Sequence, residues 1–194
     1  MSYPRTLVYL NGWPGSGKQT IAHELKELLG MRLVLDNHKI IDLAVTVAGR
    51  QGTPEYAAGR ALIFEATVGA AAASSANERG FIMTGAHAGP PFDTGVFALA
   101  MSAVQRYAAP PLRVIGVTLI LNEEENLRRL AGPNRETKLK SPNVLKDFRT
   151  RNLLSGLPNE LVLDVSALSP REAAQRIADY VLTLDVSPSD AVDA

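Results

Sequence analysis

The sequence predicts an α/β protein in which helices cover both faces of a parallel sheet. Short apolar, β-prone segments alternate along the chain with segments of helical periodicity, as in strands joined by helical crossovers. A glycine-rich loop stands between the first strand and the first helix, which is the usual order around a bound phosphate. No linker or internal repeat divides the 194 residues, so we expect one domain at 1–185 and a flexible tail at 186–194.

Periodicity and boundary residues place the individual elements. The predicted strands lie at 7–10, 31–36, 81–84, 113–121 and 161–165. The first helix follows Lys18 and ends at Gly30, and the other expected helices lie at about 37–48, 54–77, 94–107, 123–131, 143–153 and 170–184. Capping residues mark three of these helix starts, namely Thr53-Pro54, Asn122 with Glu125, and Ser169-Pro170 with Glu172.

The segment between the first strand and the first helix has the sequence of a phosphate-binding loop. Its glycines let backbone N–H groups point inward, Lys18 adds a positive charge, and the following helix offers its N-terminus to an anion. We therefore predict a nucleotide-binding loop formed by Gly12, Trp13, Pro14, Gly15, Ser16, Gly17, Lys18, Gln19 and Thr20.

One position of this loop departs from the usual pattern. The residue after the lysine is normally a Ser or Thr that binds Mg²⁺, but Gln19 stands there and Thr20 comes one place later. A glutamine is expected to reach the metal only through water. The departure therefore weakens direct metal ligation more than it weakens nucleotide binding.

Composition disfavours several other kinds of site and partner. The chain has no cysteine, which excludes disulfides and thiolate metal sites, and its three histidines are too scattered for a metal-binding spacing. Twenty basic and twenty acidic residues leave no net charge, which disfavours nucleic acid and anionic membrane surfaces as partners. We find no signal-peptide pattern and no apolar run of membrane-spanning length, so we expect a cytoplasmic monomer or homodimer.

These features resemble the P-loop kinase group that includes shikimate kinase, gluconate kinase, chloramphenicol phosphotransferase and the nucleoside monophosphate kinases. The loop at Gly12 to Thr20 is the most specific likeness, and its sequence is similar to that of the nucleoside monophosphate kinases. Asp36 at the end of the second strand and the arginines between Leu127 and Lys140 add weight through their order. The resemblance implies a P-loop NTPase fold with strand order 2-3-1-4-5, and transfer of the γ-phosphoryl group of ATP to a small acceptor.

The resemblance also implies roles for particular residues. Lys18 would hold the β- and γ-phosphates, Asp36 would act as the general base for the acceptor hydroxyl, and Arg135 would reach the phosphates from a lid at about 128–141. Arg128 or Arg129 would lie over the nucleotide base, and Thr20 with Asp36 would serve Mg²⁺. An N-cap of the next helix is the alternative role for Asp36.

Three further residues are candidates for contact with the acceptor. His38 follows Asp36 in the first helical turn, Arg60 lies on the long helix, and His87 belongs to the loop after the third strand. The alternatives are a partly exposed surface histidine, a solvated or ion-paired arginine, and a hydrogen-bonded loop histidine. The third strand ends Met83-Thr84-Gly85 without a Walker B acid, so metal binding would depend on Asp36.

The leading hypothesis is an ATP-dependent kinase that phosphorylates a hydroxyl group of a small molecule. The loop itself suggests a nucleoside monophosphate kinase as the alternative, although the Asp-x-x-Arg element of that family is not clear in this sequence. A kinase of 5′-hydroxyl nucleic-acid ends is disfavoured by the neutral charge balance. Gln19 and the missing Walker B acid favour a fourth reading, a nucleotide-binding protein without transferase activity.

Overall fold

The computed structural model describes residues 3–91, 95–132 and 141–184. In this part of the chain, five parallel strands form one sheet in the order β2-β3-β1-β4-β5. The strands are β1 (Thr6–Gly12), β2 (Val34–Asp36), β3 (Gly80–Gly85), β4 (Arg113–Ile120) and β5 (Leu161–Asp164). The predicted parallel sheet and its strand order are confirmed.

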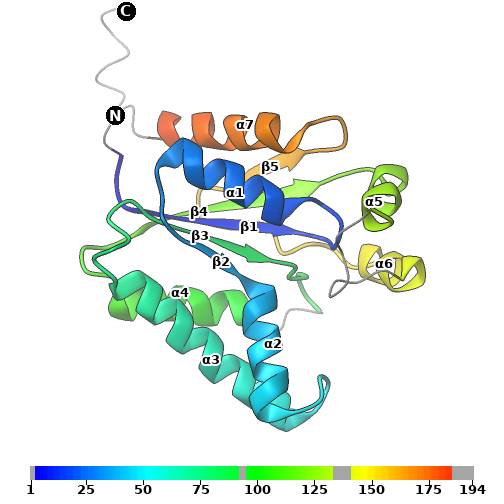
Figure 1. Ribbon diagram of the computed structural model, residues 1–194, viewed down its shortest axis with the longest axis horizontal. Coiled ribbons are helices and arrows are strands. Elements are labelled where there is room, and N and C mark those ends of the chain that lie inside the picture. Colours follow the sequence, from blue (N-terminus) through cyan, green and yellow to red (C-terminus); the bar gives the residue numbers. More distant parts are fainter. Residues whose placement is uncertain (1–2, 92–94, 133–140, 185–194) are drawn as a thin grey trace, which may run out of the picture.

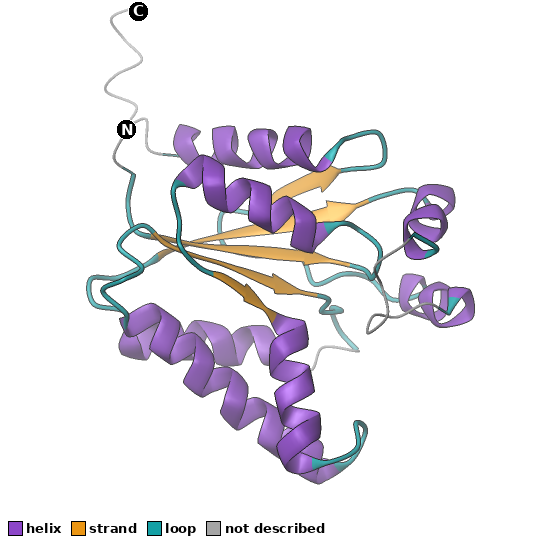
Figure 2. Ribbon diagram, viewed as in Figure 1, coloured by secondary structure: helices purple, strands orange, loops and turns teal. Residues whose placement is uncertain are grey.

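Helices cover both faces of this sheet (Figure 1). They are α1 (Lys18–Leu29), α2 (Asn37–Ala48), α3 (Pro54–Ala73), α4 (Val96–Tyr107), α5 (Glu123–Leu130), α6 (Pro142–Arg149) and α7 (Pro170–Thr183). Helices α1 and α7 lie on one face, α3 and α4 on the other, and α5 and α6 stand near the carboxyl ends of the strands (Figures 1 and 2). None of the helices in the described ranges is long and apolar enough to cross a membrane.

The central strand β1 divides the core into two layers. Val8 and Leu10 pack with the buried residues of α1 and α7, whereas Leu7 and Tyr9 pack with those of α3 and α4. All four side chains are fully buried, and burial of each such side chain is worth about 1.5–3 kcal/mol. The continuous apolar run in the sequence is thus the mark of a strand that is covered on both faces.

The predicted helix at 54–77 ends earlier, because side chains from outside the helix satisfy its last carbonyls. Asn77 Nδ2 donates to the carbonyl of Ala71 at 2.9 Å, and the Arg5 guanidinium donates to those of Ala72 and Ser74 at 2.7 and 3.1 Å. The helix therefore stops at Ala73. The second strand and the helix after Ser141 are likewise shorter than predicted, at Val34–Asp36 and Pro142–Arg149.

Strand register brings the residues at the carboxyl ends of the strands to one edge of the sheet. Asp36 on β2 pairs with Thr84 on β3, and Thr84 pairs with Leu10 on β1. The loops that follow these three strands therefore start side by side. In open parallel sheets this edge is where ligands bind.

Candidate active site

The glycine-rich loop connects β1 to α1 as predicted. Gly15 and Gly17 have φ values of 88° and 85°, a left-handed conformation that glycine adopts without steric cost. Gly17 is also the N-cap residue of α1, and no side chain of the described residues caps this end of the helix. The hydroxyl oxygen of Ser16 is buried in the loop, with no hydrogen-bond partner in the part of the chain that the structure describes. An orphaned buried donor beside a helix N-terminus fits the binding of a phosphate group.

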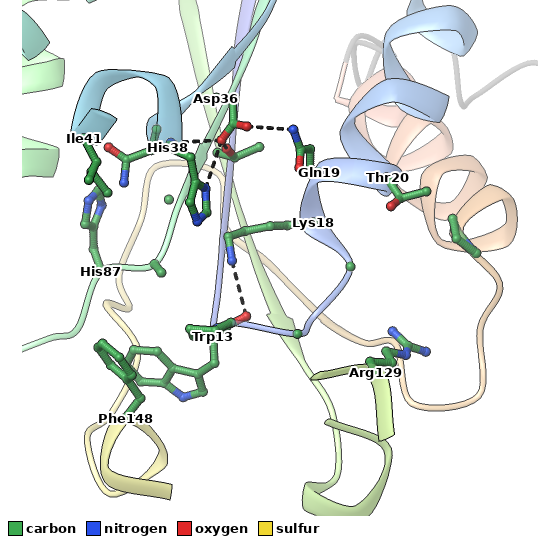
Figure 3. A pocket seen from close by; sticks show the side chains of 18 of the residues that line it. Trp13, Lys18, Gln19, Thr20, Asp36, His38, Ile41, His87, Arg129 and Phe148 are labelled. Atoms are coloured by element: carbon green, nitrogen blue, oxygen red, sulfur yellow. Dashed lines mark hydrogen bonds and ion pairs between the residues drawn. The ribbon is translucent and has the colours of Figure 1, made fainter. Parts of the chain in front are cut away.

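Lys18 lies against this loop and is almost buried. Its side-chain ammonium donates to the backbone carbonyls of Gly12 at 2.9 Å and Trp13 at 3.3 Å. The residue is 8% exposed. Figure 3 shows the side chain reaching from the start of α1 across the loop towards Trp13. The positive charge predicted for the phosphate site is therefore present inside the loop.

Asp36 ends β2, caps α2 and lines the same cleft as Lys18. Its Oδ1 accepts a hydrogen bond from the backbone N–H of His38 at 3.0 Å, which is the N-cap interaction. The residue is 6% exposed. The structure thus gives Asp36 the cap role and also places its carboxylate at the cleft, so the two roles considered for this residue are compatible.

Gln19 contacts Asp36, and Thr20 lines the same cleft. The side-chain amide of Gln19 donates to Asp36 Oδ2 at 2.7 Å. Thr20 is exposed, and Figure 3 shows it farther along α1 than Gln19, on the side away from Asp36. Successive residues of a helix point about 100° apart around its axis, so Gln19 and Thr20 face different directions. The joint metal role of Thr20 and Asp36 stays a prediction.

His38 and Arg60 line the cleft beside Asp36. His38 Nδ1 lies 3.2 Å from Asp36 Oδ1, and the imidazole side chain is 46% exposed. Arg60 on α3 donates to the side-chain oxygen of Asn37 at 3.3 Å, and its Nε is buried without a hydrogen-bond partner. Arg60 is thus held at the cleft by a neutral group, and no ion pair of this residue is found among the described side chains.

His87 also lines the cleft, but the protein holds it firmly. The side chain of Asn11 accepts from the backbone N–H of His87 at 2.8 Å and donates to its carbonyl at 3.0 Å. The imidazole Nδ1 forms a short hydrogen bond with the hydroxyl of Tyr9. His87 is therefore a buried, hydrogen-bonded loop histidine that also lines the cleft, so its structural role is compatible with contact to an acceptor.

The predicted lid arginines behave differently from one another. Arg128 pairs with Glu125 at 2.6 Å, and its side chain is 72% exposed. Arg129 is far less exposed: it pairs with Glu125 at 2.5 Å and donates to the carbonyls of Ser16 and Val165 at 3.3 and 2.7 Å. Arg129 therefore ties the phosphate-binding loop to the segment between β5 and α7.

These two arginines change the pKa of the Glu125 carboxyl. Hydrogen bonds from Arg128, and secondly from Arg129, lower the pKa of the Glu125 carboxyl to about 2. The carboxylate is therefore ionised throughout the neutral range. Glu125 was expected to help cap α5, and Asn122 does accept its backbone N–H at 2.8 Å. The Glu125 side chain, however, turns towards the arginines.

An aromatic cluster closes the cleft on the side of α6. Trp13 and Phe148 lie with ring centroids 5.9 Å apart, and the Arg151 guanidinium lies 5.2 Å from the centroid of Phe148. Trp13 is 6% exposed and packs with Ala88 and with apolar residues of α5 and α6. The predicted loop residue Trp13 thus anchors the loop through its side chain as well as lying in it.

All of these groups surround one cleft of about 1210 Å³ at the carboxyl edge of the sheet. The predicted residues that line it are Trp13, Pro14, Gly15, Gly17, Lys18, Gln19, Thr20, Asp36, His38, Arg60, His87 and Arg128. Gly12 and Ser16 belong to the same loop, just beneath its surface. Arg135, most of the predicted lid and the predicted tail at 186–194 lie outside the described residues.

Comparison with solved structures identifies the fold. A sugar kinase from Janibacter sp. superposes with a TM-score of 0.64 at 18% identity, covering 97% of this chain and 99% of that one. A gluconokinase from Sinorhizobium meliloti gives 0.64 at 14% identity, with 94% and 95% covered. Shikimate kinase from Acinetobacter baumannii gives 0.55 at 19% identity, with 96% and 97% covered.

This chain has the fold of the P-loop small-molecule kinases. The resemblance drawn from the loop and from the order of the elements is thereby confirmed at the level of the fold. No protein-family model and no curated protein matches the sequence. The likeness to these kinases therefore rests on the fold and on the loop.

Two contacts of this cleft were missed by sequence reasoning. The bond between Gln19 and Asp36 joins residues 17 positions apart, and the bond from Arg129 to the carbonyl of Ser16 spans 113 positions. The only sequence signal for the first was the unusual residue after the lysine. The second had no local signal, because Arg128 and Arg129 are adjacent and of the same residue type.

Proposed function

We propose that this protein is an ATP-dependent kinase that transfers the γ-phosphoryl group to a hydroxyl of a small molecule. One observation carries this proposal. Asp36 lies in the same cleft as Lys18 of the phosphate-binding loop and is joined to the start of α1 through Gln19. A carboxylate beside the phosphate site is the group that phosphoryl transfer to a hydroxyl requires.

The proposed reaction assigns a step to each of these residues. The acceptor oxygen attacks the γ-phosphorus, the bond from that phosphorus to the bridging oxygen breaks, and ADP leaves. Asp36 accepts the proton of the acceptor hydroxyl. Lys18 and the loop N–H groups stabilise the charge on the phosphate oxygens, a contribution of roughly 3 kcal/mol for one such donor in other enzymes.

The loop divides the cleft into two parts with different lining. We call the part formed by Gly15, Gly17, Thr20, Arg129 and residues 166–170 the nucleotide half. The other part, the acceptor half, is formed by Asp36, His38, Asp42, Arg60, His87, Phe148 and Arg151. Residues of the phosphate-binding loop, the start of α1 and Arg129 contribute to the first, whereas residues of β2, α2, α3, α6 and of the loops after β3 and α6 form the second.

Charges in the acceptor half favour a neutral or singly charged acceptor. The arginines that line it in the described part of the chain are Arg60 and Arg151, and Arg151 is ion-paired with Asp147 at 2.5 Å. Asp36 and Asp42 line the same half. A nucleoside monophosphate brings a dianionic phosphate, which is usually bound by several arginines. This balance favours a hydroxylated metabolite over a nucleoside monophosphate.

The site offers few protein ligands for Mg²⁺, and these suffice. In the described ranges, no group of three or more His, Cys, Asp or Glu side chains is placed to hold a metal ion. Mg²⁺ commonly binds to one or two carboxylates together with substrate phosphates and water, so Asp36 and the phosphates of ATP are a sufficient donor set. When bound, the ion would neutralise charge on the phosphates.

ADP release from Mg·ATP by wild type and by Asp36→Asn, across a panel of acceptors, tests the proposal. The panel contains sugars, gluconate, shikimate, phenicol and aminoglycoside antibiotics, nucleoside monophosphates and 5′-hydroxyl oligonucleotides. Wild type should release ADP with one acceptor class at the roughly 1–100 s⁻¹ typical of kinases. Asp36→Asn should lower kcat by about 10²–10⁴-fold while ATP still binds.

Asparagine is a suitable replacement because it also caps helices well, so Asp36→Asn should fold. Asp179→Asn, an exposed change on α7, is the matched control and should leave kcat unaltered. Full activity in Asp36→Asn would contradict the role of this residue as the base. ATP binding without turnover on any acceptor would instead favour a nucleotide-binding protein that has no transferase activity.

A further inference from the structure

Gln19 replaces the usual metal-binding Ser or Thr after the loop lysine, and it contacts the carboxylate assigned as the base. Its side-chain N–H donates to Asp36 Oδ2 at 2.7 Å, while Oδ1 accepts the backbone N–H of His38 at 3.0 Å. We propose that Gln19 is a positioning residue that orients Asp36 for proton acceptance. This inference rests on the proposed kinase function.

The two hydrogen bonds hold the carboxylate from opposite ends. Oδ1 accepts the bond from His38 at the N-terminus of α2, and the hydroxyl of Thr84 donates to the same oxygen at 3.5 Å. Oδ2 accepts the bond from Gln19, which opposes the rotation about the Cβ–Cγ bond that would exchange the two oxygens. Because the Asp36 side chain is only 8% exposed, the hydrogen bond is poorly replaced by water.

The bond also connects α1, which carries the phosphate-binding lysine, to β2, which carries the proposed base. Asp36 belongs to β2 and α2, at one end of the acceptor half. Gln19 is the second residue of α1, directly after Lys18. Figure 3 shows the three side chains in sequence, with Gln19 extending from α1 towards Asp36 and Lys18 extending towards the loop. Gln19 thus ties the base to the helix that carries the phosphate-binding lysine.

A serine or threonine at position 19 could not form this bond. The hydroxyl oxygen of either residue is bonded directly to Cβ, two bonds closer to the backbone than the amide nitrogen of glutamine. It therefore does not reach Asp36. Substitution by serine therefore distinguishes a role of residue 19 at the metal from a role through Asp36. If residue 19 acts on the metal, Gln19→Ser restores the usual ligand and preserves or raises activity. If it acts through Asp36, the same change lowers kcat.

The experiment is a mutant cycle with the preferred acceptor. It compares kcat, the KM for acceptor and the Kd for ATP in wild type, Gln19→Ala, Gln19→Ser, Gln19→Glu, Asp36→Asn and the double variant Gln19→Ala/Asp36→Asn. We expect Gln19→Ala and Gln19→Ser to lower kcat about tenfold, as for loss of one hydrogen bond to a charged group. Gln19→Glu, which puts a second carboxylate beside Asp36, should lower it further. The Kd for ATP should stay within about twofold for the neutral variants.

The double variant gives the sharpest readout. If Gln19 acts through Asp36, removing it from Asp36→Asn causes no further tenfold loss, so the effects are non-additive. Gln175→Ala is the matched control, because it removes the exposed hydrogen bond of 2.8 Å from Gln175 to Asp179 on α7. It should leave kcat unchanged.

Three results would overturn the inference. They are an active Gln19→Ser variant, multiplied losses in the double variant, or a rise in the Kd for ATP that accounts for the whole loss of Gln19→Ala. An inactive wild type would overturn the proposed function itself, and this outcome is distinct from an active wild type whose Gln19 variants are unimpaired. Far-UV circular dichroism and thermal unfolding of each variant exclude loss of the fold as the cause.

Discussion

The nucleotide half and the acceptor half of the cleft are built by different means. The loop of the nucleotide half is shaped by backbone conformation, with left-handed glycines, a helix N-terminus and the ammonium of Lys18 on loop carbonyls. Arg129 then fastens this loop to the segment after β5. The acceptor half consists of side chains, among them a half-exposed His38 and an Arg60 whose Nε is buried without a partner.

Under the proposed function, this difference separates the groups that would bind ATP from the groups that would contact the acceptor. Backbone N–H groups and a clamped arginine serve the same phosphate chain whatever the acceptor is. Side chains on α2, α3 and α6 can change without disturbing the loop. Variants in the two halves should therefore affect different kinetic constants, and the following predictions test this separation.

Lys18→Ala should have the largest effect. Removing the only ammonium that the described structure places inside the loop should lower kcat by about 10²–10³-fold, and it should also weaken ATP binding. Steady-state ADP release and calorimetric titration with ATP measure the two quantities. Lys26→Ala on the same helix is the control, since Lys26 pairs only with the exposed Glu27 among the described ion pairs. A fully active Lys18→Ala variant would contradict the phosphate-binding assignment.

The loop and the sheet could be predicted from sequence because their determinants are local. Glycines at fixed spacing, a lysine, and the change from strand to helical periodicity all lie within 6–29. The bond from Gln19 to Asp36 was not predictable, because it depends on β2 and α1 meeting at one edge of the sheet. The end of α3 was misplaced for a similar reason, since Arg5, 67 positions away from Ala72, satisfies a carbonyl of its last turn.

The adjacent arginines of α5 also show that sequence cannot predict contacts that depend on packing. Sequence reasoning placed either Arg128 or Arg129 over the nucleotide base; the structure finds Arg128 mostly exposed and Arg129 bonded to both the loop and the segment after β5. Adjacent residues of a helix point in directions about 100° apart, and only the packing of α5 against the loop decides which of them faces inward. The contact of Arg128 with the nucleotide base stays a prediction.

Arg129→Ala should have the second largest effect, and it should act on the nucleotide half and on stability together. Loss of its bonds to Glu125 and to buried carbonyls should lower the free energy of unfolding by about 2 kcal/mol and raise the Kd for ATP several-fold, because the loop loses its fastening. Urea unfolding and ATP titration measure these changes. Arg128→Ala is the control for stability, since the ion pair of this exposed side chain is screened by water and contributes little. Equal destabilisation by both variants would contradict the clamp.

Arg60→Met should have the smallest effect and should be confined to the acceptor half. The change keeps an apolar stem of similar length but removes the guanidinium, so an acceptor group that binds Arg60 loses its partner. We expect the KM for acceptor to rise about tenfold, while the KM for ATP stays unchanged. Arg106→Met on α4, where the exposed Arg106 pairs with Glu65, is the matched control.

The KM values of the Arg60→Met variant test whether the acceptor half and the nucleotide half act independently. Arg60 contacts Asn37, the first residue of α2, so a purely structural role would lower the melting temperature and alter kcat through Asp36. A rise in the acceptor KM alone would assign the guanidinium to the acceptor. A rise in both KM values would instead show that α2 and α3 transmit changes to the loop, and that the acceptor half is mechanically coupled to the nucleotide half through Asp36 and Gln19.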